Sequence, residues 1–196
     1  TRKPVGLGGK IMVAMMNFGH SAMAEWGLSF LQHAPDAMVL DCGCGGGANI
    51  KTLLKLCPNG KVQGIDYSAV SVEKARKVNA RAIAAGRCTV QQASVAELPF
   101  EAEQFDVVTA FETVYFWPEL AQNFREVYRV LKPGGTFFIC NEANGETAKD
   151  DKWTQIINGM TIYTDADLKV YLEKAGFCQI QSHKNKKGWL CITAQK

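Results

Sequence analysis

The chain has no long hydrophobic run and no segment that resembles an export signal. None of its apolar stretches approaches the ~20 residues that a membrane-spanning helix needs. No charged region followed by an apolar core and a small-residue cleavage site is visible in the sequence. We therefore expect a cytoplasmic protein with no membrane among its partners.

Strong charge and metal-ligand patterns are also missing. The net charge is +3 over 196 residues, without the clustered basic face that nucleic-acid binding calls for. The seven cysteines include no Cys-x-x-Cys spacing, and Cys42 and Cys44 have no further ligands nearby in the sequence. We expect buried, reduced thiols, no metal site and no nucleic-acid partner.

The composition that remains suits one globular domain, with 47% hydrophobic and 21% charged residues and no internal repeat. Apolar strand-like segments alternate with segments of helical spacing, which predicts a parallel sheet with helices on both faces. Two final strands around a polar turn predict an antiparallel hairpin. The predicted strands cover 37–42, 61–66, 88–93, 105–111, 136–141, 177–182 and 189–194, and the helices cover 21–33, 48–57, 68–85, 118–131 and 164–175, with an irregular segment over 142–163.

The most informative segment is 39–47, where the apolar run Val-Leu ends in Asp41 and a glycine-rich turn follows. Helical spacing resumes directly after this turn. Glycine adopts tight dihedrals and leaves no side chain in the way, and the first turn of a helix offers N–H groups without partners. The segment therefore predicts a site for a nucleotide-type cofactor.

The same turn is compatible with more than one kind of cofactor. Residues 43–48 fit the G-x-G-x-x-A pattern of dinucleotide-binding proteins, and Asp66 ends the next predicted strand at about the 20-residue spacing of that motif. Against this, Asp41 would face the pyrophosphate with a carboxylate, and would better suit a cofactor with a cationic or amine-bearing end. The predicted C-terminal hairpin also differs from a second parallel half.

Five motifs occur in an order that resembles the class I S-adenosylmethionine-dependent methyltransferases, and among them the small-molecule group. They are VLDCGCGGGANI, the acid in VQGIDYS, ASVAELPF, FDVVTAFETVYFW and LKPGG. The resemblance implies an α/β, Rossmann-like, doubly wound seven-stranded sheet, mostly parallel with a C-terminal antiparallel hairpin. It also implies S-adenosylmethionine as cofactor. We expect one methyltransferase domain over 36–196, after a segment over 1–35 that could close over the cofactor.

The resemblance implies roles for the positions that match. The acid and the glycines of the turn would hold the amino-acid end of the cofactor, and the acid after the second strand would bind both ribose hydroxyls. The aromatic residue that follows and two residues after the third strand would contact the adenine, although Ser94 stands where many relatives have an acid. The expected cofactor-binding residues are Asp41, Gly43, Gly45, Gly47, Asp66, Tyr67, Ser94, Val95 and Phe111.

Methyl transfer itself demands few particular side chains. The enzyme aligns the two reactants and excludes water, and a general base is needed only if the acceptor is protonated at the working pH. The Asp/Asn/Ser-Pro-Pro-aromatic motif of enzymes that methylate nucleic-acid bases is absent. We therefore expect a small acceptor with an apolar or aromatic portion. The candidate catalytic residues are His20, Glu112 and Tyr115, and the candidate acceptor contacts are Phe116, Trp117, Trp153, Met160 and Tyr163.

Two other functions stay open at this point. One is an NAD(P)-dependent oxidoreductase. The other is a non-catalytic module that binds S-adenosylmethionine, because binding and turnover would use the same residues. The atom that is methylated also stays open. For the oligomeric state we expect a monomer or a homodimer.

Overall fold

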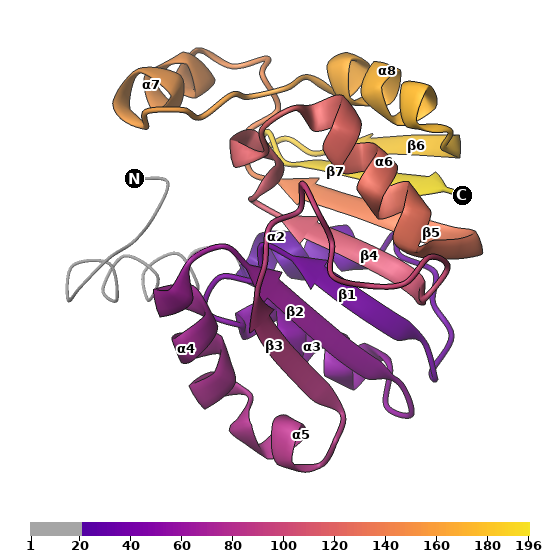
Figure 1. Ribbon diagram of the computed structural model, residues 1–196. Coiled ribbons are helices and arrows are strands. Elements are labelled where there is room, and N and C mark those ends of the chain that lie inside the picture. Colours follow the sequence, from indigo (N-terminus) through magenta and orange to yellow (C-terminus); the bar gives the residue numbers. More distant parts are fainter. Residues whose placement is uncertain (1–20) are drawn as a thin grey trace.

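The computed structural model describes residues 21–196, and Figure 1 shows one twisted sheet with helices on both sides. The strands are β1 (Met38–Cys42), β2 (Lys61–Asp66), β3 (Cys88–Gln92), β4 (Phe105–Phe111), β5 (Leu131–Asn141), β6 (Cys178–Lys184) and β7 (Leu190–Gln195). Their order in space is β3-β2-β1-β4-β5-β7-β6. Strands β1 to β5 are parallel to one another, and β7 is antiparallel to both β5 and β6. The predicted sheet is confirmed, including its hairpin.

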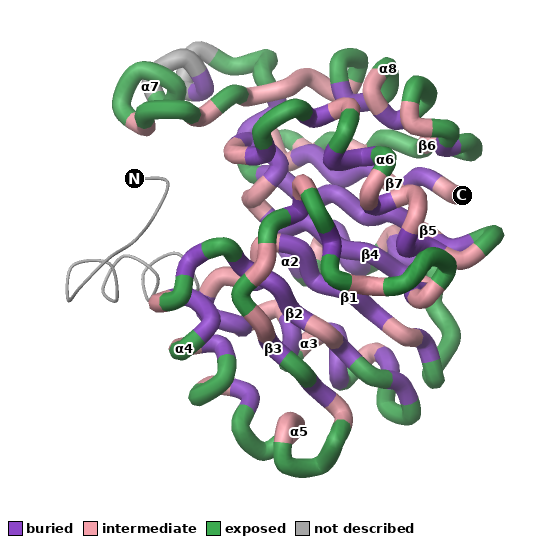
Figure 2. The backbone as a smooth tube through the Cα atoms, in the orientation of Figure 1, coloured by how far each residue is buried: buried purple, intermediate pink, exposed green. Residues whose placement is uncertain are grey.

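Two groups of helices cover the two faces of this sheet. One group is α2 (Ser21–Leu28), α3 (Ala48–Leu56), α4 (Ala69–Val78) and α5 (Ala80–Ala84), and the other is α6 (Leu120–Val130) and α8 (Asp165–Ala175). A separate apolar core lies under each group. Figure 2 shows the central strands buried along most of their length between these layers. The arrangement is doubly wound, as predicted.

Strand β5 shows how one strand serves both cores. Phe137 and Ile139 belong to the core under α6 and α8, whereas Phe138 and Cys140 belong to the core under α2 and α3. All four side chains are fully buried. Successive residues of a strand point to opposite faces, so a strand covered on both sides needs a continuous apolar run rather than an alternating one.

The first described helix is shorter than predicted. α2 ends at Leu28, and the hydroxyl of Ser29 donates a hydrogen bond to the carbonyl of Trp26 at 2.6 Å. Such a side-chain bond competes with the helical backbone pattern. α2 contacts β5 and buries Met23 in the core, so this part of the 1–35 segment is a packing helix. Residues 1–20 lie outside the described residues, and a closing segment there stays a prediction.

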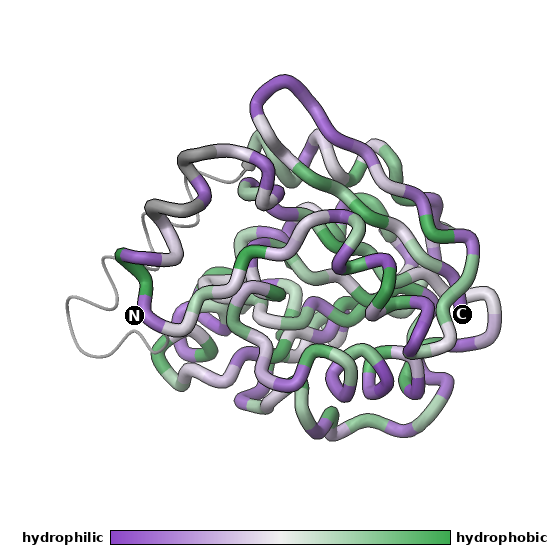
Figure 3. The backbone as a smooth tube through the Cα atoms, turned by 90° about the horizontal axis from the view of Figure 1, so that it is seen from above, coloured by the Kyte–Doolittle hydropathy of each residue, from purple (hydrophilic) through white to green (hydrophobic). Residues whose placement is uncertain are grey.

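Two further predictions about helices are wrong in detail. The helix over 68–85 is divided at Asn79, whose side-chain amide donates to the carbonyl of Gly47 at 2.9 Å and to that of Ala75 at 3.0 Å. The segment 142–163, predicted as irregular, contains α7 (Ala148–Ile156). Thr147 and Asp150 form a capping box at its start. In Figures 1 and 3, α7 stands apart from both helix layers.

Further observations concern the hairpin turn, the cysteines, the lengths of the helices and groups of metal-binding side chains. The turn of the β6–β7 hairpin is hydrophilic in Figure 3, as expected of a solvated tip. Six cysteines are buried and Cys178 is exposed, with no disulfide among them. Between residues 21 and 196, no helix combines the length and apolar character needed to cross a membrane. In the same stretch, no group of three His, Cys, Asp or Glu side chains could hold a metal ion.

The strand order also predicts where a ligand belongs. From β1 the chain moves outward through β2 to β3, then returns to the other side of β1 as β4. The strand order therefore reverses between β1 and β4. In open parallel sheets, ligands bind beyond the carboxyl ends of the strands at such a reversal.

Candidate functional site

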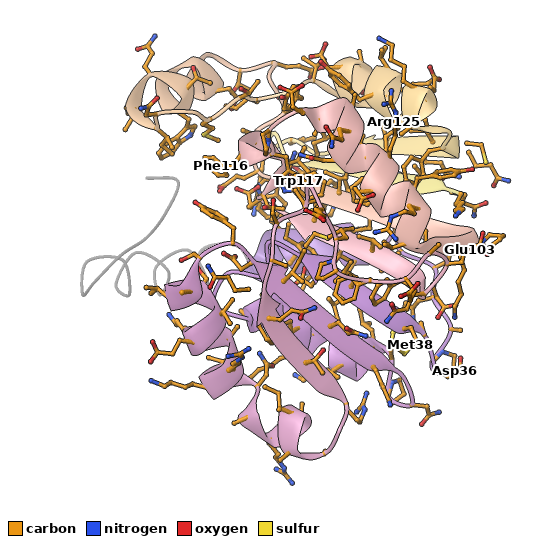
Figure 4. All side chains as sticks on the ribbon, viewed as in Figure 1. Asp36, Met38, Glu103, Phe116, Trp117 and Arg125 are labelled. Carbon is orange, nitrogen blue, oxygen red and sulfur yellow. The ribbon has the colours of Figure 1, made fainter. Side chains whose placement is uncertain are left out.

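A cavity of about 220 Å³ lies beyond the carboxyl ends of β1 to β4. It brings together residues from four separate stretches of sequence, and in Figure 4 Phe116 and Trp117 mark its β4 side. Five of the predicted cofactor residues line it. The lining residues are Gly43, Ile65, Asp66, Tyr67, Ala93, Ser94, Val95, Thr113, Phe116, Trp117 and Pro118.

The glycine turn after β1 has three residues with left-handed backbones. The φ angles of Gly43, Gly45 and Gly47 are 75°, 52° and 79°. A Cβ atom on Gly43 would lie 2.2 Å from the hydroxyl oxygen of Thr113, and one on Gly47 would lie 2.9 Å from Ala75. A Cβ atom on Gly45 would meet nothing within 4 Å. The outer glycines are thus required by packing, whereas the middle one leaves backbone open to a ligand.

Asp66 fastens the turn to the end of β2. One carboxylate oxygen accepts the N–H of Gly45 at 2.9 Å, and the other accepts the N–H of Ser68 at 2.8 Å. Burial raises the pKa of this carboxyl, and the two backbone hydrogen bonds oppose that shift. Each carboxylate oxygen has a second lone pair, so Asp66 can accept hydroxyl groups from a ligand while it holds the turn.

Asp41 lies under the turn and is only 1% exposed. One of its oxygens accepts the hydroxyl of Thr109 at 2.9 Å, and the other has no hydrogen-bond partner among the described residues. Burial raises its pKa to about 7, the Thr109 bond lowers it, and the charge of Asp66 raises it further. A buried carboxylate oxygen without a partner is costly, so a cationic group nearby would stabilise this one.

The side of the cavity near β3 is mostly apolar. Tyr67 is 42% exposed, and Val95 belongs to the core under α6. Between them Ser94 supplies a hydroxyl, which accepts the N–H of Ala96 at 3.2 Å. A flat aromatic ligand fits this combination of ring, aliphatic side chain and hydroxyl.

Glu112 follows β4 in a left-handed conformation, with φ 56°. Its side chain accepts the backbone N–H of Glu142, and one of its carboxyl oxygens lies 3.3 Å from the hydroxyl oxygen of Tyr115. Burial raises its pKa to about 8. Non-glycine residues with this backbone geometry are uncommon and concentrate at functional sites.

Tyr115 belongs to the short helix η1 (Val114–Phe116) and is only 2% exposed. Its hydroxyl donates to the carbonyl of Ala143 at 3.1 Å and accepts the N–H of the same residue at 2.9 Å. The side chain thereby ties the end of β4 to the segment that follows β5. This geometry supports a structural role for Tyr115.

Comparisons with known proteins identify the family. The family model of the methyltransferase domain matches residues 40–139, just over half of the chain. The chain belongs to this family. Because the family is that of S-adenosylmethionine-dependent methyltransferases, membership confirms the family predicted from the sequence and its cofactor class.

Individual relatives agree with this assignment. The methyltransferase domain is 29% identical over 138 residues to 24-methylenesterol C-methyltransferase 2 of Arabidopsis thaliana, covering 69% of the chain and 38% of that protein. It is 35% identical over 111 residues to demethylmenaquinone methyltransferase of Symbiobacterium thermophilum, covering 56% of the chain and 44% of that protein. The chain thus spans less than half the length of these curated relatives.

A solved structure shares the fold. It is a SAM-dependent methyltransferase from Aquifex aeolicus, with a TM-score of 0.78, 20% identity and coverage of 94% of this chain and 97% of that one. At that level of identity the likeness concerns the fold. It confirms the Rossmann-like arrangement predicted for the methyltransferase domain.

Some of the predicted residues of the methyltransferase lie away from the cavity. The ring of Phe111 packs against that of Phe138 at a centroid distance of 5.2 Å, in the core under α2 and α3. Three more of the predicted cofactor residues do not line the cavity. Asp41 belongs to β1, and Gly45 and Gly47 belong to the turn that follows this strand. His20 lies outside the described residues.

Sequence reasoning also missed part of the cavity wall. Thr113 packs against Gly43, and its hydroxyl oxygen accepts the indole N–H of Trp117 at 3.2 Å. Nothing local in the sequence distinguishes this threonine. Only its place directly after the strand-ending Phe111-Glu112 pair could have drawn attention to it.

Proposed function

We propose that this chain binds S-adenosylmethionine and transfers its methyl group to a small-molecule acceptor. The observation that carries the proposal is the cavity that joins Gly43, Asp66, Tyr67 and Ser94 at the carboxyl edge of the sheet. Family membership supplies the cofactor class. The methyl donor supplies an electrophilic methyl group on a cationic sulfur when it is bound.

The residues present fit the three parts of that cofactor. The open space at Gly45 and the buried carboxylate of Asp41 favour a cationic amino-acid end. Asp66, with lone pairs left over, would hold the ribose hydroxyls. Tyr67, Ser94 and Val95 would hold the adenine. Asp66, Tyr67, Ser94 and Val95 line the cavity, whereas Asp41 belongs to β1 and Gly45 to the turn that follows it.

On the acceptor side, Glu112 is the residue we assign to the transfer site. It follows β4, the strand next to the glycine turn, and its raised pKa of about 8 lets it hold or take up a proton near neutral pH. The main work of the chain is to orient the acceptor and exclude water. A general base is then required only for an acceptor that carries a proton on the attacking atom.

We propose an acceptor with an apolar portion. On α7, which follows the carboxyl end of β5, two large apolar side chains are exposed to solvent, Trp153 by 49% and Ile156 by 74%. The relatives compared above are named for sterol and menaquinone substrates. Both substrate names denote molecules with extended apolar parts, which matches this surface.

We propose an oligomeric state, a location and a set of partners for the protein. The protein works as a monomer or homodimer in the cytoplasm, with a small-molecule acceptor and with neither nucleic acid nor membrane as partner. The mild net charge of +3 supports the exclusion of nucleic acid.

Two measurements test the proposal and its alternatives. Calorimetric titration with S-adenosylmethionine, S-adenosylhomocysteine and NAD should give micromolar binding of the first two and none of NAD. Binding of NAD alone would instead support the oxidoreductase. Transfer of a radiolabelled methyl group to a panel of sterols, quinol precursors and short isoprenoids then separates an enzyme from a non-catalytic binding module, which would bind the cofactor and label nothing.

A further inference from the structure

Two of the buried cysteines lie directly opposite each other in the sheet. Cys140 of β5 pairs with Cys191 of β7 in the antiparallel register, and this is the one pair in the described sheet that joins two cysteines. Their sulfur atoms are close enough to hydrogen-bond with each other. Opposed residues of antiparallel strands have Cα atoms about 4.5–5.5 Å apart, within the range of about 4.4–6.8 Å that disulfides usually span. A disulfide between them therefore needs little movement of the backbone.

Helix α2 covers both thiols. The sulfur of Cys140 lies 3.7 Å from the carbonyl oxygen of Met23, and the sulfur of Cys191 lies 3.7 Å from the carbonyl oxygen of Gly27. A Cβ atom on Gly27 would lie 2.5 Å from the sulfur of Cys140, so the missing side chain lets α2 lie directly on the pair. Neither cysteine is exposed to solvent. An oxidant therefore reaches them only when α2 moves away.

The pair stays reduced while α2 is in place. All seven cysteines are free thiols in the structure. Hydrogen bonding with Cys191 and burial raise the pKa of Cys140 well above its ordinary value, and only the thiolate attacks an oxidant. A helix of eight residues is marginal by itself, so α2 can open locally while the sheet stays folded.

We propose that Cys140 and Cys191 form a reversible disulfide when α2 opens in the presence of hydrogen peroxide. The thiolate of one cysteine attacks a peroxide oxygen, the O–O bond breaks, and a sulfenic acid and water form. The thiolate of the other cysteine attacks that sulfur, the S–S bond forms, and the sulfenic oxygen leaves as a second water. Two electrons pass from the sulfur atoms to the peroxide, and the two thiol protons end in the water molecules.

This bond would close a covalent loop around the last part of the chain. The segment between the two cysteines contains α7, α8 and β6. The backbone carbonyl of Cys140 also accepts the N–H of Glu112 at 3.0 Å, so the bond would form beside the residue that we assign to the transfer site. The inference does not depend on the proposed function, because the bond is detected without cofactor or acceptor.

The test treats the full chain with hydrogen peroxide in a Cys178→Ser background, which removes the exposed thiol. We expect an intact mass lower by the mass of two hydrogen atoms, a peptide that joins Cys140 to Cys191, and a return to the starting mass with dithiothreitol. Cys140→Ser and Cys191→Ser should each prevent this link. A link between other cysteines, such as Cys42 and Cys44, or oxidation without any link, would overturn the proposal, and so would a chain that does not react.

Gly27→Ala tests whether α2 controls access to the pair. Its methyl group would push α2 away from the sulfur of Cys140, so the disulfide should form at least about tenfold faster, as overpacking on this scale allows. Glu25→Ala changes an exposed position of the same helix and should leave the rate as in the wild-type protein. Equal rates in both variants would show that α2 is not the barrier. The peptide from the wild-type sequence decides the link even if Gly27→Ala does not fold.

Discussion

The two halves of the carboxyl edge are built differently. Around β1, β2 and β3, short turns are fastened to one another, with the N–H of Gly45 on Asp66 and the N–H of Gly43 on the carbonyl of Ile65. Beyond β4 and β5, the chain makes the long excursion 142–163, joined to the rest through Tyr115 at Ala143 and Thr161. The first half has a formed cavity, whereas the second half exposes large apolar side chains.

This difference separates two tasks. A site for a common cofactor can be rigid, because the same molecule enters in every reaction cycle and a preformed site costs less to order on binding. The second half, which we assign to the acceptor, carries α7. This helix stands away from the sheet, so changes of its sequence disturb few packed contacts. We therefore expect substitutions in the first half to change cofactor affinity and those in the second half to change acceptor use.

The largest expected effect comes from filling the open space at the middle glycine. Gly45→Val should reduce affinity for S-adenosylhomocysteine by more than about a hundredfold, because the side chain would occupy the place of the ligand. Its left-handed backbone adds about 1–2 kcal/mol of destabilisation.

Gly86 provides the matched control for this change. It also has positive φ, 69°, and a Cβ atom on it would meet nothing within 4 Å, but it lies between α5 and β3 and not in the turn after β1. Gly86→Val should lower the melting temperature to a similar degree and leave calorimetric affinity unchanged. Equal loss of affinity in both variants would mean that strain, not lost space, is responsible.

The next effect concerns the carboxylate that holds the turn. Asp66→Ala should weaken cofactor binding by about 1.5–3 kcal/mol, the range for hydrogen bonds to a charged group. Asp106 offers a matched control, because it also accepts a backbone N–H, that of Met38 at 2.8 Å, but at the start of β1. Asp106→Ala should alter stability without altering affinity for the cofactor. If Asp66→Ala binds the cofactor as tightly as the wild-type protein in calorimetry, Asp66 does not have the role assigned to it.

Asp41 should make both binding and stability depend on pH. Since its pKa of about 7 means that it is ionised mainly above neutrality, affinity for S-adenosylmethionine should rise about tenfold between pH 6 and pH 8. Asp41→Asn should bind more weakly and lose this rise. Calorimetry in buffers of matched ionic strength tests it, and an unaltered slope in the variant would exclude Asp41 as the cause.

The stability effect has the opposite direction. The folded chain keeps a proton on Asp41 while the unfolded chain, with a pKa near 3.8, has lost it. The free energy of unfolding should therefore fall as pH rises from about 4 to about 7 and then level off. Urea unfolding at pH 4.5 and pH 7.5 should show a smaller fall in Asp41→Asn. Glu112, with its pKa raised to about 8, should account for part of the fall that remains.

The same contrast explains what sequence could and could not predict. The glycine turn, the acid at the end of β2 and the apolar strands are local patterns, and the structure has them where they were expected. The break at Asn79 depends on a bond to Gly47, which is 32 residues away. Thr113 acquires its place only because the end of β4 meets the turn after β1. No local pattern reports such contacts.

The helix α7 was missed for a different reason. Its sequence, AKDDKWTQI, is largely polar and has no apolar stripe that would predict a packed helix. The one local signal was Thr147 followed three residues later by Asp150, the pair that caps it. A helix stabilised by its cap more than by burial is the kind that hydrophobic periodicity does not reveal.

The smallest effect on the folded chain should come from this helix, and it tests the acceptor half directly. Trp153→Ser and Ile156→Ser should change the free energy of unfolding by no more than about 0.5 kcal/mol, as for other exposed positions, and should leave cofactor affinity alone. If α7 contacts an apolar acceptor, KM for that acceptor should rise by about threefold to tenfold in each variant, because part of the buried apolar area is lost. Val170 is 46% exposed but belongs to a different helix, α8, so Val170→Ser is the matched control. An acceptor KM that rises equally in all three variants, or in none of them, would place the acceptor away from α7 and leave the cofactor half of the site as it is.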